Sequence, residues 1–126
     1  MSVEVEDLSD GAKALGLSAE TIQTDVELKL RLAGIRVVTA EEDLKVPGMP
    51  TLYVNPQVLS NSKAMSISIA LDQNVVLDRN GQRQVGIKTW EVGAVGVNPS
   101  AEGIRSEIKD LVDQFLNAWL SVNPKK

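Results

Sequence analysis

The 126-residue chain contains no cysteine and no histidine. Without cysteine it can form no disulfide, no thiolate nucleophile and no cysteine-bound zinc or iron–sulfur centre. Without histidine it lacks the commonest general base and the commonest transition-metal ligand. These two absences narrow the possible chemistry more than any residue that is present, and we expect no cofactor.

An excess of positive charge and long apolar runs are also missing. The formal net charge is −4 and the pI is about 4.8, which argues against nucleic-acid binding, because such surfaces neutralise phosphates with cations. No apolar run approaches the roughly 20 residues that span a bilayer, so we expect no membrane insertion. The first residues, MSVEVE, lack the basic and apolar regions of a signal peptide. Hydrophobic residues make up 43% and charged residues 24%, which predicts a single soluble domain over residues 1–126.

The clearest structural pattern is a long hairpin from Met65 to Val92. Its first arm alternates, and successive strand side chains point to opposite faces. One face is apolar, and the other carries small, mostly polar side chains. The turn is Asp78–Gln82, where Asn80 and Gly81 accept positive φ angles. The apolar set is Met65, Ile67, Ile69, Leu71, Val75 and Leu77, and the opposite set is Ser66, Ser68, Ala70, Asp72 and Asn74.

The register of this hairpin is ambiguous. A three-residue loop ending at a left-handed Gly81 pairs Leu71 with Thr89 and sends Trp90 to the polar face. A two-residue loop pairs Leu71 with Trp90 but misplaces Val85 and Ile87. One register cannot bury both sets, because a one-residue slip flips every side chain. We predict a β-bulge near Thr89 that turns both sets inward. The alternative, Trp90 on the open face, would itself indicate function.

Two helices are expected outside the hairpin. Ser18 is a good N-cap for a helix over Ala19–Ala33, and Gly34 suits the position after its last turn. Residues 26–32 also alternate with period two, but strong helix formers favour the helix. A second helix should run from Pro99 to about Val122 with Asn98 as its N-cap. The residues expected to be buried in the first helix are Ile22, Val26, Leu30 and Ala33. Those of the second helix are Ile104, Ile108, Leu111, Val112, Phe115, Trp119 and Val122.

The remaining segments complete the order β-α-β-β-β-β-α. The predicted fold is an α+β, two-layer α/β sandwich, in which two long helices cover one face of a mixed five-stranded sheet. Short strands are expected at residues 3–6, at Ile35–Thr39, and at Thr51–Asn55, where Pro56 ends the last one. The connecting segments are a possible helical turn at 12–15, a loop over 40–50, a connector over 57–63 and an exit segment over 93–97.

Three groups of residues could carry chemistry, and each has a simpler interpretation. Glu41, Glu42 and Asp43 could contribute to a Ca²⁺ or Mg²⁺ site, but a solvated loop is favoured. The Gly93–Gly96 segment before the last helix could present N–H groups to an anion, but it matches no phosphate-binding motif. The mid-hairpin residues Asp72, Lys88 and Glu91 could form a polar catalytic group, but nothing indicates a cleft, and exposed cross-strand ion pairs are the favoured interpretation.

The polar face of the hairpin is the candidate interaction surface. Its residues are small and mostly uncharged, whereas an exposed sheet usually carries long charged side chains. If both helices cover the other face, this leaves a smooth platform for a partner or a second copy. It lacks the stacking aromatics and basic residues of an RNA-binding sheet. The surface comprises Ser66, Ser68, Ala70, Asp72 and Asn74.

Several segments resemble a group of small uncharacterised bacterial proteins, over nearly the whole chain. They are VELKLRLAGI over 26–35, LYV over 52–54, Thr89-Trp90, LVDQF over 111–115 and the closing Asn123-Pro124. Members of that group usually follow an export signal. At fold level, residues 3–55 also resemble the N-terminal domain of the periplasmic protein TolB and anticodon-binding-like α/β domains. The resemblance implies a periplasmic or secreted setting and a non-catalytic binding role, and it brings no catalytic or ligand residue.

We therefore expect a small domain, not an enzyme, that binds another protein or its own copy. The alternatives are a small-ligand or carbohydrate-binding module, an enzyme that uses carboxylates alone, and a cytosolic accessory subunit. A continuous uncharged sheet face favours the first function. A deep pocket lined by Asp72, Lys88, Glu91 or Arg83 would favour the small ligand or the enzyme.

Overall fold

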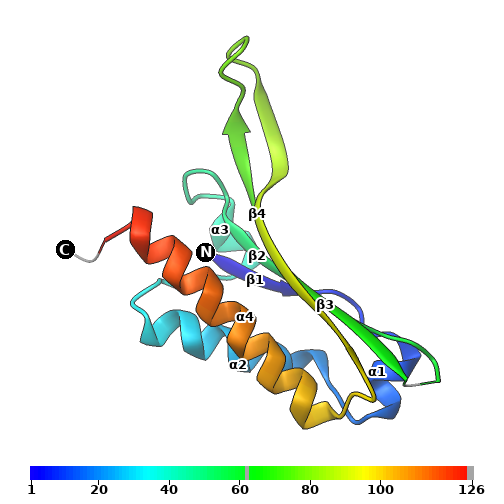
Figure 1. The fold of residues 1–126 in the computed structure, drawn as a ribbon. Coiled ribbons are helices and arrows are strands. Elements are labelled where there is room, and N and C mark those ends of the chain that lie inside the picture. The colour runs from blue at the N-terminus through cyan, green and yellow to red at the C-terminus, as the bar shows by residue number, and fades with distance from the viewer. Residues whose placement is uncertain (62, 125–126) are drawn as a thin grey trace.

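The computed structural model describes residues 1–61 and 63–124 and has an α+β fold. Two long helices pack on one face of a mixed four-stranded sheet, and one hairpin extends well beyond both layers (Figure 1). The elements in chain order are β1 (Ser2–Val5), α1 (Asp10–Ala14), α2 (Ala19–Leu32), α3 (Ala40–Asp43), β2 (Thr51–Val58), β3 (Ala64–Val76), β4 (Arg83–Val97) and α4 (Ala101–Val122).

The sheet has the strand order β1-β2-β3-β4, with β1 parallel to β2 and the other pairs antiparallel. The prediction of a fifth strand at Ile35–Thr39 is wrong. This segment forms only two hydrogen bonds with the start of the chain, from Met1 to the Arg36 carbonyl and from Val38 to the Met1 carbonyl. Thr39 then caps α3 instead of continuing an extended chain. The crossover from β1 therefore reaches β2, through α1, α2 and α3.

Strand β2 continues through Pro56, which was expected to end it. The Leu59 N–H bonds to the Ala64 carbonyl, so odd residues of β2 bond to β3 and even residues turn away from it. The missing N–H of Pro56 would therefore point toward β1, which pairs with β2 only as far as Val54. Proline is tolerated there because no ladder hydrogen bond is lost.

The bulge predicted near Thr89 is confirmed. Leu71 pairs with Trp90 and Asp72 with Lys88, so Thr89 has no partner across the ladder. Its hydroxyl instead donates to the Leu71 carbonyl at 3.2 Å. Trp90 consequently turns toward the helices and is half-buried there.

A second irregularity, which the sequence did not predict, lies nearer the turn. Gln73 pairs with Ile87 but Val75 pairs with Gln84, and Gly86 adopts a φ of +64° between them. The turn is a four-residue loop closed by hydrogen bonds between Leu77 and Gln82 and between Gly81 and Leu77, with Gly81 left-handed as expected. The expectation that Val85 and Ile87 face inward is wrong, since both are exposed.

The distal part of this hairpin, residues 72–88, is called the arm below. It stands clear of the helices (Figure 1), so neither of its faces has a layer to pack against. Its one brace from the loop before β2 is the Asn74 N–H, which donates to the Gly48 carbonyl at 2.6 Å. A two-stranded ribbon without a covering layer contributes little stability of its own.

The two long helices agree well with the sequence prediction. Helix α2 is capped by Ser18 and ends in a Schellman motif, with Gly34 bonded to Arg31 and Ile35 to Leu30. Helix α4 begins later than predicted, because Ser100 rather than Asn98 accepts the capping hydrogen bond from Gly103. Its apolar stripe is buried as expected except at Trp119, which is half-buried, and at Val122, which is exposed.

The core lies between the helices and one face of the sheet. Cross-strand partners share a face, and the pairing defines four inward rows across β2, β3 and β4. The inward set is Leu52-Leu71-Trp90, Val54-Ile69-Val92, Pro56-Ile67-Ala94 and Val58-Met65-Gly96. The residues between these rows on β3, which are Ser66, Ser68 and Ala70, face away from the helices.

Candidate functional site

The sheet face opposite the long helices is only partly covered. The N-terminal ends of β1 and β2 are closed by α3, where Asp43 accepts hydrogen bonds from Ser2 and Thr51. The rest of this face consists of three outward rows and, beyond them, the pair Ala64-Val97, and we call it the open face. The rows are Tyr53-Ala70-Glu91, Asn55-Ser68-Gly93 and Gln57-Ser66-Val95.

The five residues expected to form an interaction surface differ in exposure. Ser66 is exposed, and Ser68, Asp72 and Asn74 are half-buried. Ala70 is only 3% exposed, so it supports the surface from beneath and does not form part of it. Asn74 lies in the arm rather than over the body, and its side-chain oxygen accepts from the Gly86 N–H at 3.1 Å. Ser66 and Ser68 therefore remain as the accessible centre of the predicted platform.

Strand β4 contributes the apolar part of the open face. Val95 is 82% exposed and Val97 is 76% exposed, although both lie within a regular ladder opposite Ser66 and Ala64. From Val92 to Val97 the strand carries no charge and no proline. Natural edge strands commonly use charges, prolines or bulges to prevent further pairing, and this stretch has none of them.

The Gly93–Gly96 segment is part of β4, not an exit from the sheet as expected. Its glycines allow close contacts with β3. A Cβ on Gly93 would lie 3.0 Å from the Ile67 carbonyl oxygen, and a Cβ on Gly96 would lie 2.8 Å from the Met65 side chain. The segment pairs residue by residue with β3, and the helix that follows begins only after Ser100.

The outer backbone of β4 is open to solvent. The Asn98 N–H donates to the Lys63 carbonyl, and hydrogen-bonding direction alternates along an antiparallel ladder. The backbone groups of Val92, Ala94 and Gly96 therefore bond to β3. Those of the odd-numbered residues Glu91, Gly93, Val95 and Val97 point outward from the sheet, and within residues 1–61 and 63–124 no strand pairs with them.

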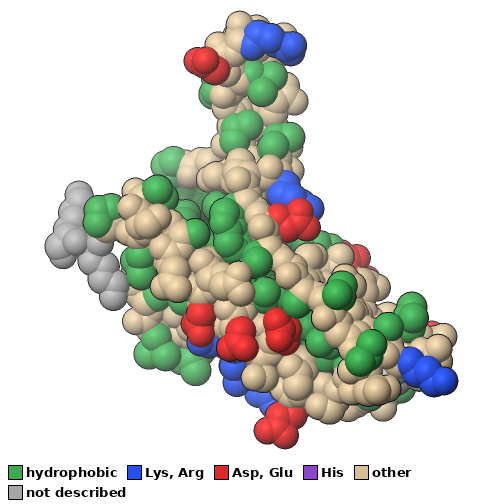
Figure 2. All heavy atoms as spheres, in the orientation of Figure 1, with side chains coloured by type: hydrophobic (Ala, Val, Ile, Leu, Met, Phe, Trp, Pro, Cys, Tyr) green, Lys and Arg blue, Asp and Glu red, His purple; other side chains and the backbone are tan. Residues whose placement is uncertain are grey.

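An aromatic pocket lies where the arm leaves the body. It has a volume of about 380 Å³ and contains three of the chain's four aromatic residues, Trp90, Phe115 and Trp119. The Phe115 ring contacts Trp90 edge-on, with 5.5 Å between the ring centroids. It packs against Trp119 in a tilted arrangement, with 5.9 Å between the centroids. In Figure 2 apolar side chains gather at the root of the arm. The remaining lining is Leu71, Gln73, Thr89, Ala118, Val122 and Asn123, none of them charged.

This pocket was not predicted from the sequence, in which Phe115 and Trp119 fall on the apolar stripe of the last helix and were expected to be core residues. Phe115 is indeed buried, but both tryptophans are half-buried. The scarcity of aromatics was a usable signal, because a chain with so few of them brings three together at one place. The lining also depends on the bulge at Thr89, which brings Trp90 to the helix side.

Asp72, Lys88 and Glu91 lie next to one another in the middle of the hairpin. Lys88 and Glu91 make an exposed ion pair at 2.9 Å, and Asp72 pairs with Lys88 across the ladder. None of the three lines the aromatic pocket or the cavity described next, and Arg83 borders only a shallow depression beside Gly48 and Asn74.

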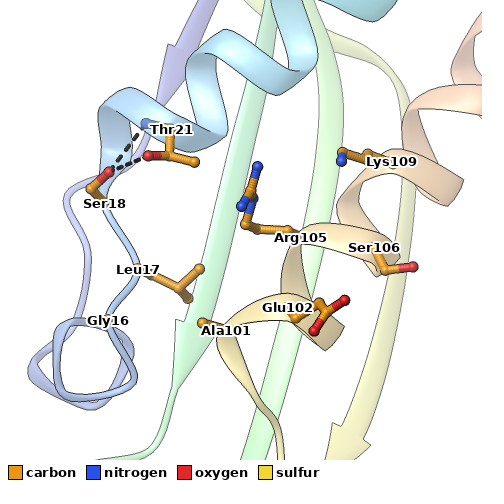
Figure 3. A pocket seen from close by; sticks show the side chains of 9 residues that line it. All are labelled: Gly16, Leu17, Ser18, Thr21, Ala101, Glu102, Arg105, Ser106 and Lys109. Atoms are coloured by element: carbon orange, nitrogen blue, oxygen red, sulfur yellow. Dashed lines mark hydrogen bonds between the residues drawn. The ribbon is translucent and has the colours of Figure 1, made fainter.

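A larger cavity of about 600 Å³ lies between the N-terminal ends of α2 and α4 (Figure 3). Its lining includes Ser18, Arg105 and Lys109. The Arg105 guanidinium donates two hydrogen bonds, at 2.8 and 3.1 Å, to Asp25. These bonds lower the pKa of the Asp25 carboxyl and raise that of Arg105. The Arg105 guanidinium in this cavity is therefore already paired with a carboxylate of the same chain, Asp25, and this ion pair joins α2 to α4.

The acidic step Glu41–Asp43 is a short helix rather than a solvated loop. Asp43 is 1% exposed and holds the start of β1 and β2 through two hydroxyl groups. Glu42 completes a capping box with Thr39, whose hydrogen bonds lower the pKa of the Glu42 carboxyl. Within the part of the chain that the structure describes, no three acidic residues converge as metal ligands would.

Comparison with known proteins adds no family. No family model and no curated protein matches the chain. The resemblance to small exported bacterial proteins therefore stays a prediction. None of the helices in the described part of the chain has the length and apolar character needed to cross a membrane.

Proposed function

We propose that this protein is a non-catalytic module that binds another protein or its own copy through the exposed end of its sheet. This binding surface consists of the open face of β3 and β4, with Ser66, Ser68 and Val95, and the outer edge of β4. The observation that carries the proposal is the pair Val95 and Val97, which are exposed in a regular, uncharged edge strand.

Two features of this surface support binding rather than simple solvation. Small side chains at Ser66, Ser68 and Gly93 leave the face nearly flat, so a partner can approach the backbone closely. The neighbouring valines supply apolar area that association would bury, at about 25 cal/mol per Å². A setting in the bacterial envelope, which the resemblance implies, would expose such a surface to other exported proteins.

The test combines self-association with selection of partners. Solution mass is measured by light scattering across a concentration series for the wild type, for Ser68→Arg and for Thr24→Arg. Thr24 is exposed on α2 on the helix side of the sheet, so its variant is the matched control. In parallel, the three proteins are panned against a displayed library of bacterial protein fragments.

We expect association or fragment binding that Ser68→Arg weakens at least tenfold and Thr24→Arg leaves unchanged. Circular dichroism establishes that both variants are folded. The proposal fails if the wild type is monomeric throughout and no displayed fragment distinguishes it from Ser68→Arg.

A further inference from the structure

The edge of β4 and the aromatic pocket both lie on the β4 side of the sheet, with the pocket beside Trp90. Together they suggest a single mode of recognition. We infer that the partner is an extended segment of another protein, which adds to β4 as a fifth strand and places one large apolar side chain in the aromatic pocket. This inference rests on the proposed protein-binding function and specifies its partner. Strand addition of this kind takes affinity from backbone hydrogen bonds and specificity from pockets for alternate side chains.

The backbone of β4 supplies the first half of the site. Gly93, Val95 and Val97 each direct an N–H and a C=O outward, in register and without an intervening bulge from Trp90 to Val97. An extended chain that pairs there satisfies these groups as β3 satisfies the opposite set. The stretch is about as long as an average strand in globular proteins.

The pocket supplies the second half, because its position follows from the alternation of side chains. A partner residue opposite Trp90 shares the face of Trp90, which is the helix side. Its side chain would therefore lie beside the pocket formed by Trp90, Phe115 and Trp119. The volume of about 380 Å³ admits a leucine or an aromatic ring with room to spare, and the uncharged lining disfavours an ionised side chain, which would lose its hydration.

Charge argues that the added strand does not come from a second copy. Arg105 and Asp113 contact α2 through Asp25 and Lys29, and a helix turns by about 200° in two residues. Glu107 therefore lies on the flank of α4 away from α2, toward the β4 edge, and the exposed Asp110 lies between that flank and Asp113. Antiparallel pairing of two β4 edges would bring these acidic flanks together, and like charges destabilise such a contact. A segment with lysine or arginine, and without acidic residues, fits this edge better.

The experiment uses displayed random octapeptides as the probe. Peptides are selected on the wild-type protein, and the strongest binder is synthesised together with a version in which alternate amides are N-methylated. We expect selected sequences with one large apolar residue near one end and few acidic residues. N-methylation on the pairing edge should abolish binding, because it removes the donors of the new ladder.

Two matched pairs of variants separate the edge from the pocket. Val95→Pro removes one outward N–H and leaves the bonds to β3 intact, whereas Val95→Thr keeps the N–H and the branched shape. Ala118→Leu fills the pocket that Ala118 lines, whereas Ala118→Ser does not. We expect Val95→Pro and Ala118→Leu each to raise the Kd of the peptide about tenfold or more, since about 1.4 kcal/mol corresponds to a factor of ten. Val95→Thr should bind the peptide more tightly than Val95→Pro, and Ala118→Ser more tightly than Ala118→Leu, and melting curves establish that all four variants are folded.

Amide hydrogen exchange and the indole N–H signals give an independent measurement. Peptide binding should protect the amides of Gly93, Val95 and Val97, while those of Val92, Ala94 and Gly96 are already protected by β3. The Trp90 and Trp119 indole signals should shift together.

Three results would overturn the inference. The first is peptide binding that Ser68→Arg weakens but Val95→Pro and Ala118→Leu do not, which leaves the proposed function standing on the open face. The second is protection of the same three amides by self-association without peptide, which would make the second copy the partner. The third is the absence of any selected peptide that protects the edge.

Discussion

Replacing Phe115 by leucine tests whether the three rings of the aromatic pocket form one packed unit. Phe115 is 2% exposed and contacts both tryptophans. An aromatic pair contributes about 0.5–1.5 kcal/mol beyond its buried area, so losing both pairs costs about 1–3 kcal/mol. Leucine restores most of the volume, and the missing carbon atoms add about 1 kcal/mol. We expect the free energy of unfolding to fall by about 2–4 kcal/mol.

Urea denaturation followed by far-ultraviolet circular dichroism measures this change, because fluorescence of the two tryptophans would itself be altered by the substitution. Ile108→Val is the control, since Ile108 is 1% exposed on the same helix and does not line the aromatic pocket. Its expected cost is about 0.5–1.5 kcal/mol. A loss in Phe115→Leu no greater than that of the control would refute the reasoning, because the ring contacts would then contribute nothing of their own.

Three further predictions concern the fold around the site. Because the pKa of Asp25 is lowered in the folded state, its pairing with Arg105 stabilises above the ordinary carboxyl pKa and is lost as the pH falls through the folded value. The difference in unfolding free energy between the wild type and Arg105→Gln should therefore shrink below about pH 4, as acid titrations of urea midpoints can measure. Asp43→Ala should cost about 1–3 kcal/mol in urea denaturation, because it removes the carboxylate that accepts from Ser2 and Thr51 and that lies 3.8 Å from the buried N-terminal ammonium. Gly86→Ala should cost about 1 kcal/mol by the same assay, since a φ of +64° strains any Cβ, and Gly86→Asn should cost less.

The helices were predictable because their signals are local. Ser18 and Gly34 lie within a turn of the backbone groups they cap or terminate, so neither depends on the rest of the fold. The predicted start of α4 was wrong for an equally local reason, because two residues that could cap the helix, Asn98 and Ser100, lie two positions apart. Asn98 adopts a φ of +50° and bonds to Lys63, which leaves Ser100 as the cap.

The number of strands was not predictable in the same way. Ile35–Thr39 has the composition of a strand, and Ile35 and Val37 do pack against the core, but a strand also needs a neighbour along its length. Pro56 shows the converse, because the proline is harmless only where β1 has already ended. Both outcomes depend on which segments lie side by side, and that information is not local.

The candidate site was predicted in part. Alternation along β3 placed Ser66 and Ser68 on the open face, because the period of two fixes the face once the core side is known. It did not reveal that Ala70 would be buried, nor that glycine-rich residues 93–97 would continue β4. The pocket required the packing of α4 against the root of the arm, which no single segment encodes.

In strand β4, neighbouring residues alternate between positions that contribute to the fold and positions available for binding. Side-chain direction and hydrogen-bond direction both alternate with a period of two, so each residue directs both toward the fold or both away from it. Val92 and Ala94 face the helices and bond to β3, whereas Gly93 and Val95 face outward and their backbone groups meet solvent. Substitution at the odd positions should therefore change binding with little effect on stability, and substitution at the even positions should do the reverse. The bulge at Thr89 ends this alternation, so the edge stops being regular at the mouth of the aromatic pocket.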